Sequence, residues 1–213
     1  MKVLLVSATP FEIAPLLQGL EEGSLVPAHP VEVLITGVGM TAAAFALGRR
    51  LAADPHTWVL QAGVAGSLDP AYPPGAVVQV LSETFADLAV EESDGSLVDL
   101  FTLGLTYADT HPFRAGRLWN DAAEKFPFLP AVHALTVNCV TGAVAGIERL
   151  KQRYPYGQIE TMEGAAAFYA CLVAGVPFAQ VRAISNRVEP RNRANWKLQE
   201  AIDNLCAVLA EMI

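Results

Sequence analysis

The sequence predicts an α/β fold in which a mostly parallel central sheet is flanked by helices on both faces. Short runs of consecutive apolar residues alternate with longer amphipathic stretches along most of the chain. Strands that helices cover on both faces show such continuous runs, and alternating strands and helices favour parallel pairing. The chain has 213 residues, 53% of them hydrophobic, which suffices for one sizeable core, so we expect one domain over residues 1–213.

The expected elements alternate from the first residues to the last. Continuous apolar runs predict strands at residues 3–6, 31–35, 58–60, 76–81 and 178–184. Apolar residues at helical spacing predict helices at residues 11–20, 41–53, 144–154, 162–174 and 196–213. Residues 91–112 have little periodicity and several turn formers, which predicts a loop with room for one short strand.

The composition argues against two classes of partner. Lys and Arg number 14 against 22 Asp and Glu, and the resulting net charge of −8 repels nucleic acid and anionic lipid surfaces. The longest apolar stretch, residues 165–179, is interrupted by a glycine and a proline and cannot span a bilayer. The three cysteines are Cys139, Cys171 and Cys206, and they form no CxxC pair and have no histidine at the spacing of a metal site. We therefore expect buried, reduced thiols in a cytoplasmic protein that holds no metal or cofactor.

Ligands of such sheets bind beyond the carboxyl ends of the strands, and three segments there suggest a site. Glu12 follows the first strand and is either a carboxylate favoured by a helix N-terminus or a general base at the sheet edge. Gly-rich segments after the second and third strands are either tight turns or places where a ligand approaches the main chain. They contain Val38, Gly63, Val64 and Ala65.

Two further polar residues lie at corresponding places later in the chain. Glu163 opens an Ala-rich helix, where it either complements the helix N-terminus or accepts hydrogen bonds from ribose hydroxyls. Asn186 follows the last strand, as a turn residue or as a group that binds a base.

Together these segments resemble a known superfamily. Glu12, TGVGM, QAGVAGSL, TMEGAAAF and VRAISN occur in the order and approximate spacing of the superfamily of methylthioadenosine/S-adenosylhomocysteine nucleosidases and nucleoside phosphorylases, over nearly the whole chain. The tail SNRVEPRNR is similar to that of the futalosine hydrolases within it. The resemblance implies a nucleoside phosphorylase-like fold and hydrolysis of futalosine to hypoxanthine and dehypoxanthine futalosine, in menaquinone biosynthesis. A methylthioadenosine/S-adenosylhomocysteine-type nucleosidase or a purine nucleoside phosphorylase is the alternative.

The resemblance also implies roles for single residues. Glu12 matches the carboxylate that activates the attacking water, and Glu163 matches the glutamate that binds the ribose 2′-hydroxyl. Asn186 occupies the position of an aspartate that protonates the purine in adenine-specific nucleosidases. The matches to the sugar, base and 5′ pockets are Met162 for the sugar, Val140 and Thr141 for the base, without the usual stacking aromatic, and Trp196 near the 5′ substituent.

Three expectations about the reaction follow. An amide accepts from a protonated ring nitrogen and donates to a carbonyl, so Asn186 favours hypoxanthine, although an amide can also flip. SATPFE and QAGVAGSL contain no Arg or Lys, so water rather than phosphate is the expected nucleophile. Arg191, in the basic run with Arg187 and Arg193, either binds the benzoate of the 5′ arm of futalosine or is a solvated surface residue.

The expected partners are a small purine nucleoside and further copies of the same chain. The resemblance implies a homo-oligomer, at least a dimer, because in the family a neighbouring subunit commonly completes the 5′ pocket. The poorly periodic residues 85–113 are compatible with a buried interface.

Overall fold

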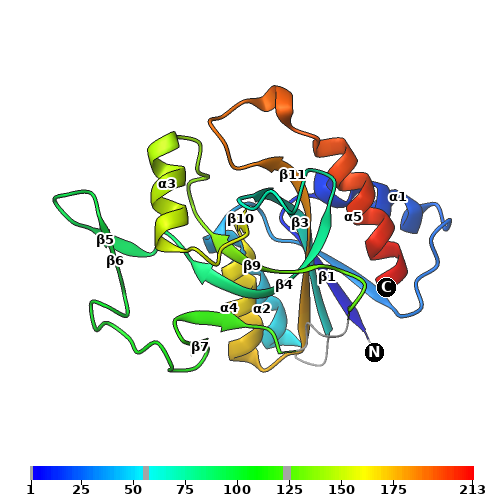
Figure 1. Ribbon diagram of the computed structural model, residues 1–213. Helices are drawn as coiled ribbons and strands as arrows, with labels where there is room; N and C mark the ends of the chain where they lie inside the picture. The colour runs from blue at the N-terminus through cyan, green and yellow to red at the C-terminus, as the bar shows by residue number, and fades with distance from the viewer. Residues whose placement is uncertain (1, 55–57, 122–125) are drawn as a thin grey trace.

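The computed structural model describes residues 2–54, 58–121 and 126–213 and has the predicted α/β architecture (Figure 1). Its main sheet has nine strands. They are β1 (Val3–Ser7), β2 (Val31–Ile35), β3 (Trp58–Ser67), β4 (Val77–Phe85), β7 (Phe113–Arg114), β8 (Arg117–Trp119), β9 (Ala131–Thr136), β10 (Ile159–Thr161) and β11 (Phe178–Arg187).

The strand pairing closes part of this sheet into a ring. The order is β2-β1-β3-β10-β9-β4-β8-β7, and β11 pairs with both β3 and β4. The pairings β3–β10–β9–β4–β11–β3 therefore return to their starting strand, which leaves these five strands without an open edge. The sheet is mixed: β1, β2, β3 and β11 run parallel, as do β10, β9 and β4, whereas β10 is antiparallel to β3 and β4 is antiparallel to β11 and β8.

Helices cover both faces of the sheet, as the continuous apolar runs predict. In Figure 1, α1 (Ala14–Glu21) and α5 (Leu198–Met212) lie on one side and α2 (Met40–Ala53) and α4 (Gly164–Ala174) on the other. Each pair buries its own apolar cluster, with Leu205 of α5 and Phe168 of α4 fully buried in the two clusters. A fifth α-helix, α3 (Val144–Arg153), lies beside the hairpin of β5 (Ala89–Glu91) and β6 (Leu97–Asp99), which projects from the body of the molecule.

Most differences from the predicted elements concern where an element ends. All five predicted strands and five predicted helices are present, but β3, β4 and β11 continue further than their apolar runs, to Ser67, Phe85 and Arg187. The first helix starts as a 3-10 turn, η1 (Pro10–Ile13), because Pro15 occupies the opening turn of α1. Another 3-10 turn, η3 (Arg193–Asn195), precedes α5.

Two sequence predictions were incomplete or wrong. Strands β7, β8, β9 and β10 of the main sheet were missed. His133 interrupts the apolar run of β9, and the other three have only 2 or 3 residues each. The prediction of buried thiols is wrong for Cys139, which is exposed in the loop after β9, and correct for Cys171 and Cys206. Within the described residues, the model has no helix that is both long and apolar enough to cross a membrane.

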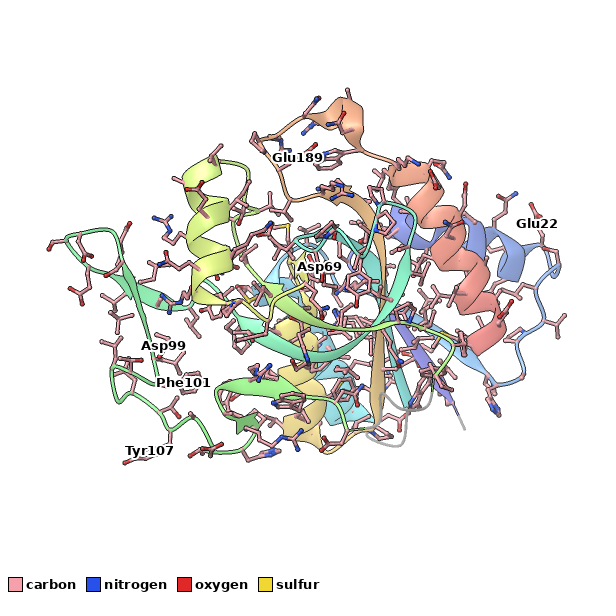
Figure 2. All side chains as sticks on the ribbon, viewed as in Figure 1. Glu22, Asp69, Asp99, Phe101, Tyr107 and Glu189 are labelled. Carbon is pink, nitrogen blue, oxygen red and sulfur yellow. The ribbon has the colours of Figure 1, made fainter. Side chains whose placement is uncertain are left out.

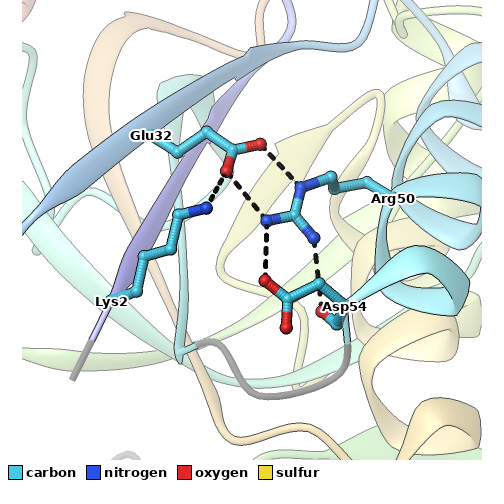
Figure 3. A network of polar contacts seen from close by, with 4 residues as sticks. All are labelled: Lys2, Glu32, Arg50 and Asp54. Atoms are coloured by element: carbon cyan, nitrogen blue, oxygen red, sulfur yellow. Dashed lines mark hydrogen bonds and ion pairs between the residues drawn. The ribbon is translucent and has the colours of Figure 1, made fainter.

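An ionic network fastens the amino ends of the first two strands to α2, at the edge opposite the carboxyl ends (Figure 3). Glu32 accepts hydrogen bonds of 2.6 and 2.8 Å from Arg50 and lies 2.5 Å from Lys2 Nζ, while Arg50 also contacts Asp54. The Arg50 and Lys2 cations lower the pKa of Glu32 to about 2. This arrangement fixes α2, and with it the loop at its N-terminus, relative to the sheet.

Candidate active site

A cavity of about 280 Å³ lies at the carboxyl ends of β1, β3 and β11, and is called the central cavity below. Its wall also includes the loop before α2, the loop after β9 and the start of α4, so residues far apart in the chain meet in one cavity. A smaller hollow of about 80 Å³ adjoins it and shares part of the wall, namely Gly66, Val140, Glu160, Asn186 and Trp196. The two hollows are therefore neighbours with a common wall.

Glu12 enters the central cavity from the 3-10 turn after β1. Its Oε2 accepts hydrogen bonds of 3.1 Å from the backbone N–H and the hydroxyl of Thr9. The bond from the Thr9 N–H is one half of a capping box, whose other half is the Thr9 side chain accepting from the Glu12 backbone. Its Oε1 accepts from the backbone N–H of Val64 at 3.1 Å, across the cavity wall. Glu12 therefore does cap the 3-10 turn at the start of the first helix, as one of its two predicted roles requires. The same contacts hold its other carboxylate oxygen, Oε1, in a fixed position at the cavity wall.

Glu163 enters from the start of α4 but does not cap its own helix. Its Oε1 instead accepts a hydrogen bond of 2.8 Å from the backbone N–H of Gly39, at the N-terminus of α2. Burial raises the pKa of this carboxyl and the nearby negative charge of Glu12 raises it further, while the positive charge of Arg182 and the Gly39 hydrogen bond act in the opposite direction. The two carboxylates thus approach each other across one cavity.

Arg182 is a buried cation beside the cavity to which sequence reasoning assigned no role. It lies on β11, is 1% exposed, and its guanidinium crosses the α-carbon of Gly63, its register partner on β3. A Cβ at position 63 would collide with Arg182 Nη1 and lie 2.8 Å from Glu12 Oε1, so the glycine makes room for both groups. Its signal in the sequence is a lone charge inside an apolar strand, which must be paired or functional.

Asn186 lies at the opposite end of the central cavity, just after a bulge in β11 at Ser185. Its Nδ2 donates to the carbonyl of Arg187 at 2.8 Å, and its Oδ1 lies 2.8 Å from Ser185 Oγ. Both polar atoms of the amide thus have a partner within the chain, and the residue lines both hollows. A bulge turns a side chain out of the regular alternation of a strand, which is how this asparagine comes to face the same space as the carboxylates.

The loop after β11 closes the smaller hollow. Arg191 donates its backbone N–H to the carbonyl of Gly142 at 3.3 Å, and its guanidinium lies 5.7 Å from the ring centroid of Trp196. Glu189 on the same loop, labelled in Figure 2, accepts from the side chain of Asn195 at 2.7 Å. These contacts join residues 187–196 to the loop after β9.

The structure brings nearly all of the predicted site residues to these two hollows. The central cavity is lined by Glu12, Val38, Val64, Ala65, Val140, Met162, Glu163, Asn186 and Trp196, and the smaller hollow adds Thr141 and Arg191. Gly63 lies behind the wall, beside Arg182. Residues missed by sequence reasoning also contribute, among them Phe11, Thr161 and Glu160.

This arrangement suits cleavage of a bond between a sugar and a base. A fixed carboxylate can take a proton from water, a second carboxylate can accept from hydroxyl groups, and an amide can pair with a heterocycle. The separation of the carboxylates from the amide, at opposite ends of one cavity, matches a substrate with a polyhydroxylated part and a planar part.

Comparison with known proteins gives consistent matches along the chain. The family model described as the phosphorylase superfamily matches residues 2–213. The futalosine hydrolase of Streptomyces coelicolor is 34% identical over 188 residues, which cover 85% of this chain and 77% of the relative. The futalosine hydrolase of Acidothermus cellulolyticus is 32% identical over 224 residues, covering 96% of this chain and 87% of the relative.

Solved structures show the same fold. The 5′-methylthioadenosine/S-adenosylhomocysteine nucleosidase of Neisseria meningitidis, in complex with methylthio-immucillin-A, superposes with a TM-score of 0.79 at 19% identity. The match covers 99% of this chain and 97% of that chain.

Proposed function

We propose that this chain, which belongs to the phosphorylase superfamily and within it to the futalosine hydrolases, hydrolyses the N-glycosidic bond of futalosine in its central cavity. The products are hypoxanthine and dehypoxanthine futalosine, and the reaction belongs to menaquinone biosynthesis. The observation that carries the proposal is the pair of buried carboxylates, Glu12 and Glu163, facing one cavity that ends at Asn186.

Glu12 acts as the general base. Its Oε1, held by the Val64 N–H, takes a proton from water, and the water oxygen forms a bond to the anomeric carbon of the ribose. The bond between that carbon and the purine breaks, and its electron pair leaves with the base, which is then protonated. Arg182 Nη1 and Glu12 Oε1 both lie against the α-carbon of Gly63, so a buried positive charge stands beside this carboxylate.

Glu163 binds the ribose. As the bond to the base breaks, positive charge builds on the sugar ring, and hydrogen bonds from the ribose hydroxyls to a carboxylate become stronger. Met162, the preceding residue, lines the same wall against the sugar. The positive charge of Arg182 lowers the pKa of Glu163 against the effect of burial, which helps to keep this acceptor ionised.

Asn186 binds the departing base. The nucleophile is water, because the site disfavours phosphate. An amide pairs with a 6-oxopurine, which is a better leaving group than adenine and does not require a full proton from an acid. Arg182 brings one basic group close to the Gly-rich wall, but Glu12 and Glu163 lie around it and their charges disfavour a phosphate ion.

Product identification tests this function. The protein is incubated with futalosine and, separately, with methylthioadenosine, each with and without phosphate, and the products are separated by chromatography. We expect free hypoxanthine and a reducing sugar at a rate that phosphate does not change. Adenine release as the faster reaction would favour a methylthioadenosine-type nucleosidase, and a ribose 1-phosphate product would favour a phosphorylase.

Arg191 is our candidate for the carboxylate of the benzoate arm. It lines the smaller hollow and lies against Trp196, so a cation and an aromatic ring stand together beside the central cavity. A carboxylate moved into such a hollow needs a charge partner. We expect Arg191→Ala to raise the Michaelis constant for futalosine about tenfold, from the loss of roughly 1–2 kcal/mol. An unchanged constant would leave Arg191 as a solvated surface residue, and Arg193→Ala is the matched control.

The assembly that we propose is a homodimer. Helices α2 and α4 present an apolar face with Phe45, Tyr169 and Val173 exposed by 69%, 41% and 56%. Beside it, residues 85–113 expose further apolar side chains, and Tyr107, labelled in Figure 2, is 79% exposed. Phe113 of this segment packs edge-on or tilted against Phe85 and Tyr169, which joins the segment to the helical face.

A further inference from the structure

Gly66 lies between two polar residues on neighbouring strands. On β3 it is the register partner of Glu160 on β10 and of Asn186 on β11, so the three residues form a row across the closed ring. Neighbouring strands are about 4.8 Å apart, which places the two outer residues roughly 10 Å from each other. The glycine between them has no side chain, and all three line both hollows. Asn186 Nδ2 and a methyl group of Val188 pack over the glycine. The row therefore presents a carboxylate at one end and an amide at the other to both hollows, and the space that these residues line is called the slot below.

Glu160 is a buried carboxylate without a cation. It is 5% exposed, and none of the ion pairs in the described part of the chain includes it. Its partners belong to a single residue: the backbone N–H of Thr141 donates to Oε1 at 2.9 Å and the hydroxyl donates to Oε2 at 2.6 Å. Each carboxylate oxygen accepts more than one hydrogen bond, so both retain capacity for a ligand.

We propose that Glu160 accepts a hydrogen bond from N1–H of a 6-oxopurine, while Asn186 binds the edge of the base that carries N7 and the 6-oxygen. The proposal rests on the proposed function and names the group that selects its base. Hypoxanthine carries a hydrogen on N1, whereas N1 of adenine carries only a lone pair. An ionised carboxylate presents acceptors alone, so it attracts the first base and repels the second.

Glu160 removes an ambiguity that Asn186 leaves open. An amide can rotate by half a turn and offer either a donor or an acceptor, so an asparagine alone pairs with a 6-oxopurine or with adenine. A carboxylate has no such alternative. The negative charge at the far end of the slot thus selects against the base that the amide alone tolerates.

The competing interpretation is that Glu160 only anchors the loop after β9. It holds both polar groups of Thr141, and a buried carboxylate with two such donors also serves a structural purpose. The two interpretations differ in one respect that can be measured. An anchor affects the binding of all bases alike, whereas a recognition group changes the ratio between hypoxanthine and adenine.

Binding of the free bases to the wild-type protein is the first measurement. Dissociation constants for hypoxanthine and adenine are determined by calorimetry at pH 8, where the carboxyl groups favour their ionised form. We expect hypoxanthine to bind at least about tenfold more tightly, since a mismatched buried polar group costs roughly 1–3 kcal/mol. Equal binding, tighter binding of adenine, or no binding of either base would overturn the proposal without any variant.

Glu160→Gln is the second measurement. The amide can still hold Thr141, its oxygen accepting the N–H and its nitrogen donating to the hydroxyl, and its remaining N–H faces the slot as a donor. We expect the hypoxanthine-to-adenine ratio to fall by about ten- to a hundredfold, in binding and in kcat/KM for futalosine against its 6-amino counterpart.

Asp87→Ala is the matched control for anchoring and for charge. Asp87 accepts a hydrogen bond from the backbone N–H of Asn138 and so holds the same loop after β9, and its charge adds to burial in raising the pKa of Glu160. This variant should leave the base ratio near that of the wild type. A ratio that shifts equally in Asp87→Ala and Glu160→Gln would support the anchor and reject our proposal.

The outcomes distinguish this proposal from the proposed function. If the wild type cleaves futalosine and Glu160→Gln keeps the wild-type ratio, the function stands and the recognition role fails. If the wild type binds hypoxanthine with the expected preference but cleaves no futalosine, the recognition role stands and the function fails.

Discussion

At the level of single residues, the site is organised around one buried cation. The guanidinium of Arg182 lies at the α-carbon of Gly63 beside Glu12. Burial raises the pKa values of Glu83 and Glu163, and the positive charge of Arg182 opposes that rise in both. Its Nε and Nη2 have no hydrogen-bond partner among the described residues. The positive charge of Arg182 therefore acts on several carboxylates at once, and it leaves their oxygens free to accept hydrogen bonds from a ligand.

The first prediction concerns the two carboxylates of the central cavity. Changing Glu12 to Gln removes the proton acceptor, and changing Glu163 to Gln replaces one acceptor by a donor toward the ribose. We expect either variant to lose about a hundredfold or more in kcat while retaining its fold, because proton transfer and transition-state hydrogen bonds each contribute on that scale. Steady-state rates with futalosine, with circular dichroism as the check on folding, measure this. Near-native turnover in Glu12→Gln would exclude it as the base.

The second prediction concerns Asn186. An ionised aspartate presents only acceptors, so Asn186→Asp leaves the carbonyl oxygen of hypoxanthine without its donor, whereas adenine offers an amino group. We expect kcat/KM to shift toward the 6-amino nucleoside by at least about 1 kcal/mol, or roughly fivefold. Rates for both nucleosides with both proteins give the ratio directly. An unchanged ratio would mean that Asn186 does not distinguish the bases.

Sequence reasoning located the residues that directly follow predicted strands or open predicted helices. Glu12, Glu163 and Asn186 are of this kind, and the structure places all three on one cavity. Arg182 was missed because it lies inside a strand, where direction depends on which neighbours pair with it. Glu160 was missed because the short strand that carries it was not predicted, so its side chain had no assigned face.

At the level of elements, the closed ring of strands requires polar groups in its interior. Glu83 on β4 is fully buried and accepts hydrogen bonds from Thr136 on β9, Thr161 on β10 and Gln180 on β11, so one carboxylate connects four strands. A Cβ at Gly164, at the start of α4, would collide with the same carboxylate. The glycine in the Met-Glu-Gly segment thus lets α4 begin directly against Glu83, which positions Glu163.

The ring itself was beyond sequence reasoning. Apolar runs identify which residues form strands, but the double pairing of β11 with β3 and β4 depends on contacts between residues far apart in the chain. The mixed direction of the sheet has the same origin, since β4 follows β3 through a short connection and runs antiparallel to β11. The local sequence pattern predicts neither the double pairing of β11 nor the mixed direction of the strands.

The third prediction concerns the pH dependence of stability. Burial raises the pKa of Glu83 from 4.5 to about 7, so the folded protein holds this proton more tightly than the unfolded chain. The stabilisation is present below pH 4.5 and is lost as the pH rises through about 7. Relative to wild type, Glu83→Gln should therefore gain up to about 3 kcal/mol in unfolding free energy between pH 5 and 8.

Urea unfolding at both pH values measures this gain. Glu32→Gln is the matched control, because the pKa of Glu32 is lowered and this carboxylate is mostly ionised in both states across that range. Its unfolding free energy should follow the wild-type profile. Parallel profiles for Glu83→Gln and wild type would show that Glu83 does not titrate between folded and unfolded states.

At the level of the whole molecule, the site occupies one edge of the sheet and the exposed apolar surface occupies another face. The apolar residues of α2 and α4 line a hollow of about 530 Å³ with no charged side chain in its wall. Large exposed apolar patches in a protein with a net charge of −8 mark interaction surfaces. The surface on α2 and α4 adjoins the loop of Val38, and Val38 itself lines the central cavity.

The fourth prediction therefore concerns assembly. Val173 on α4 is 56% exposed within this hollow, and a glutamate there would bring a charge into the proposed interface. We expect Val173→Glu to weaken the dimer by at least about a hundredfold, or roughly 3 kcal/mol, because an unpaired charge at a buried interface is costly.

Val144→Glu on α3, also 56% exposed but outside that hollow, is the matched control and should remain dimeric. Light scattering across a concentration series, with futalosine turnover measured on the same samples, gives both readouts. A wild-type monomer with full activity at assay concentration would contradict the dimer, and a dimeric Val173→Glu variant would place the interface elsewhere.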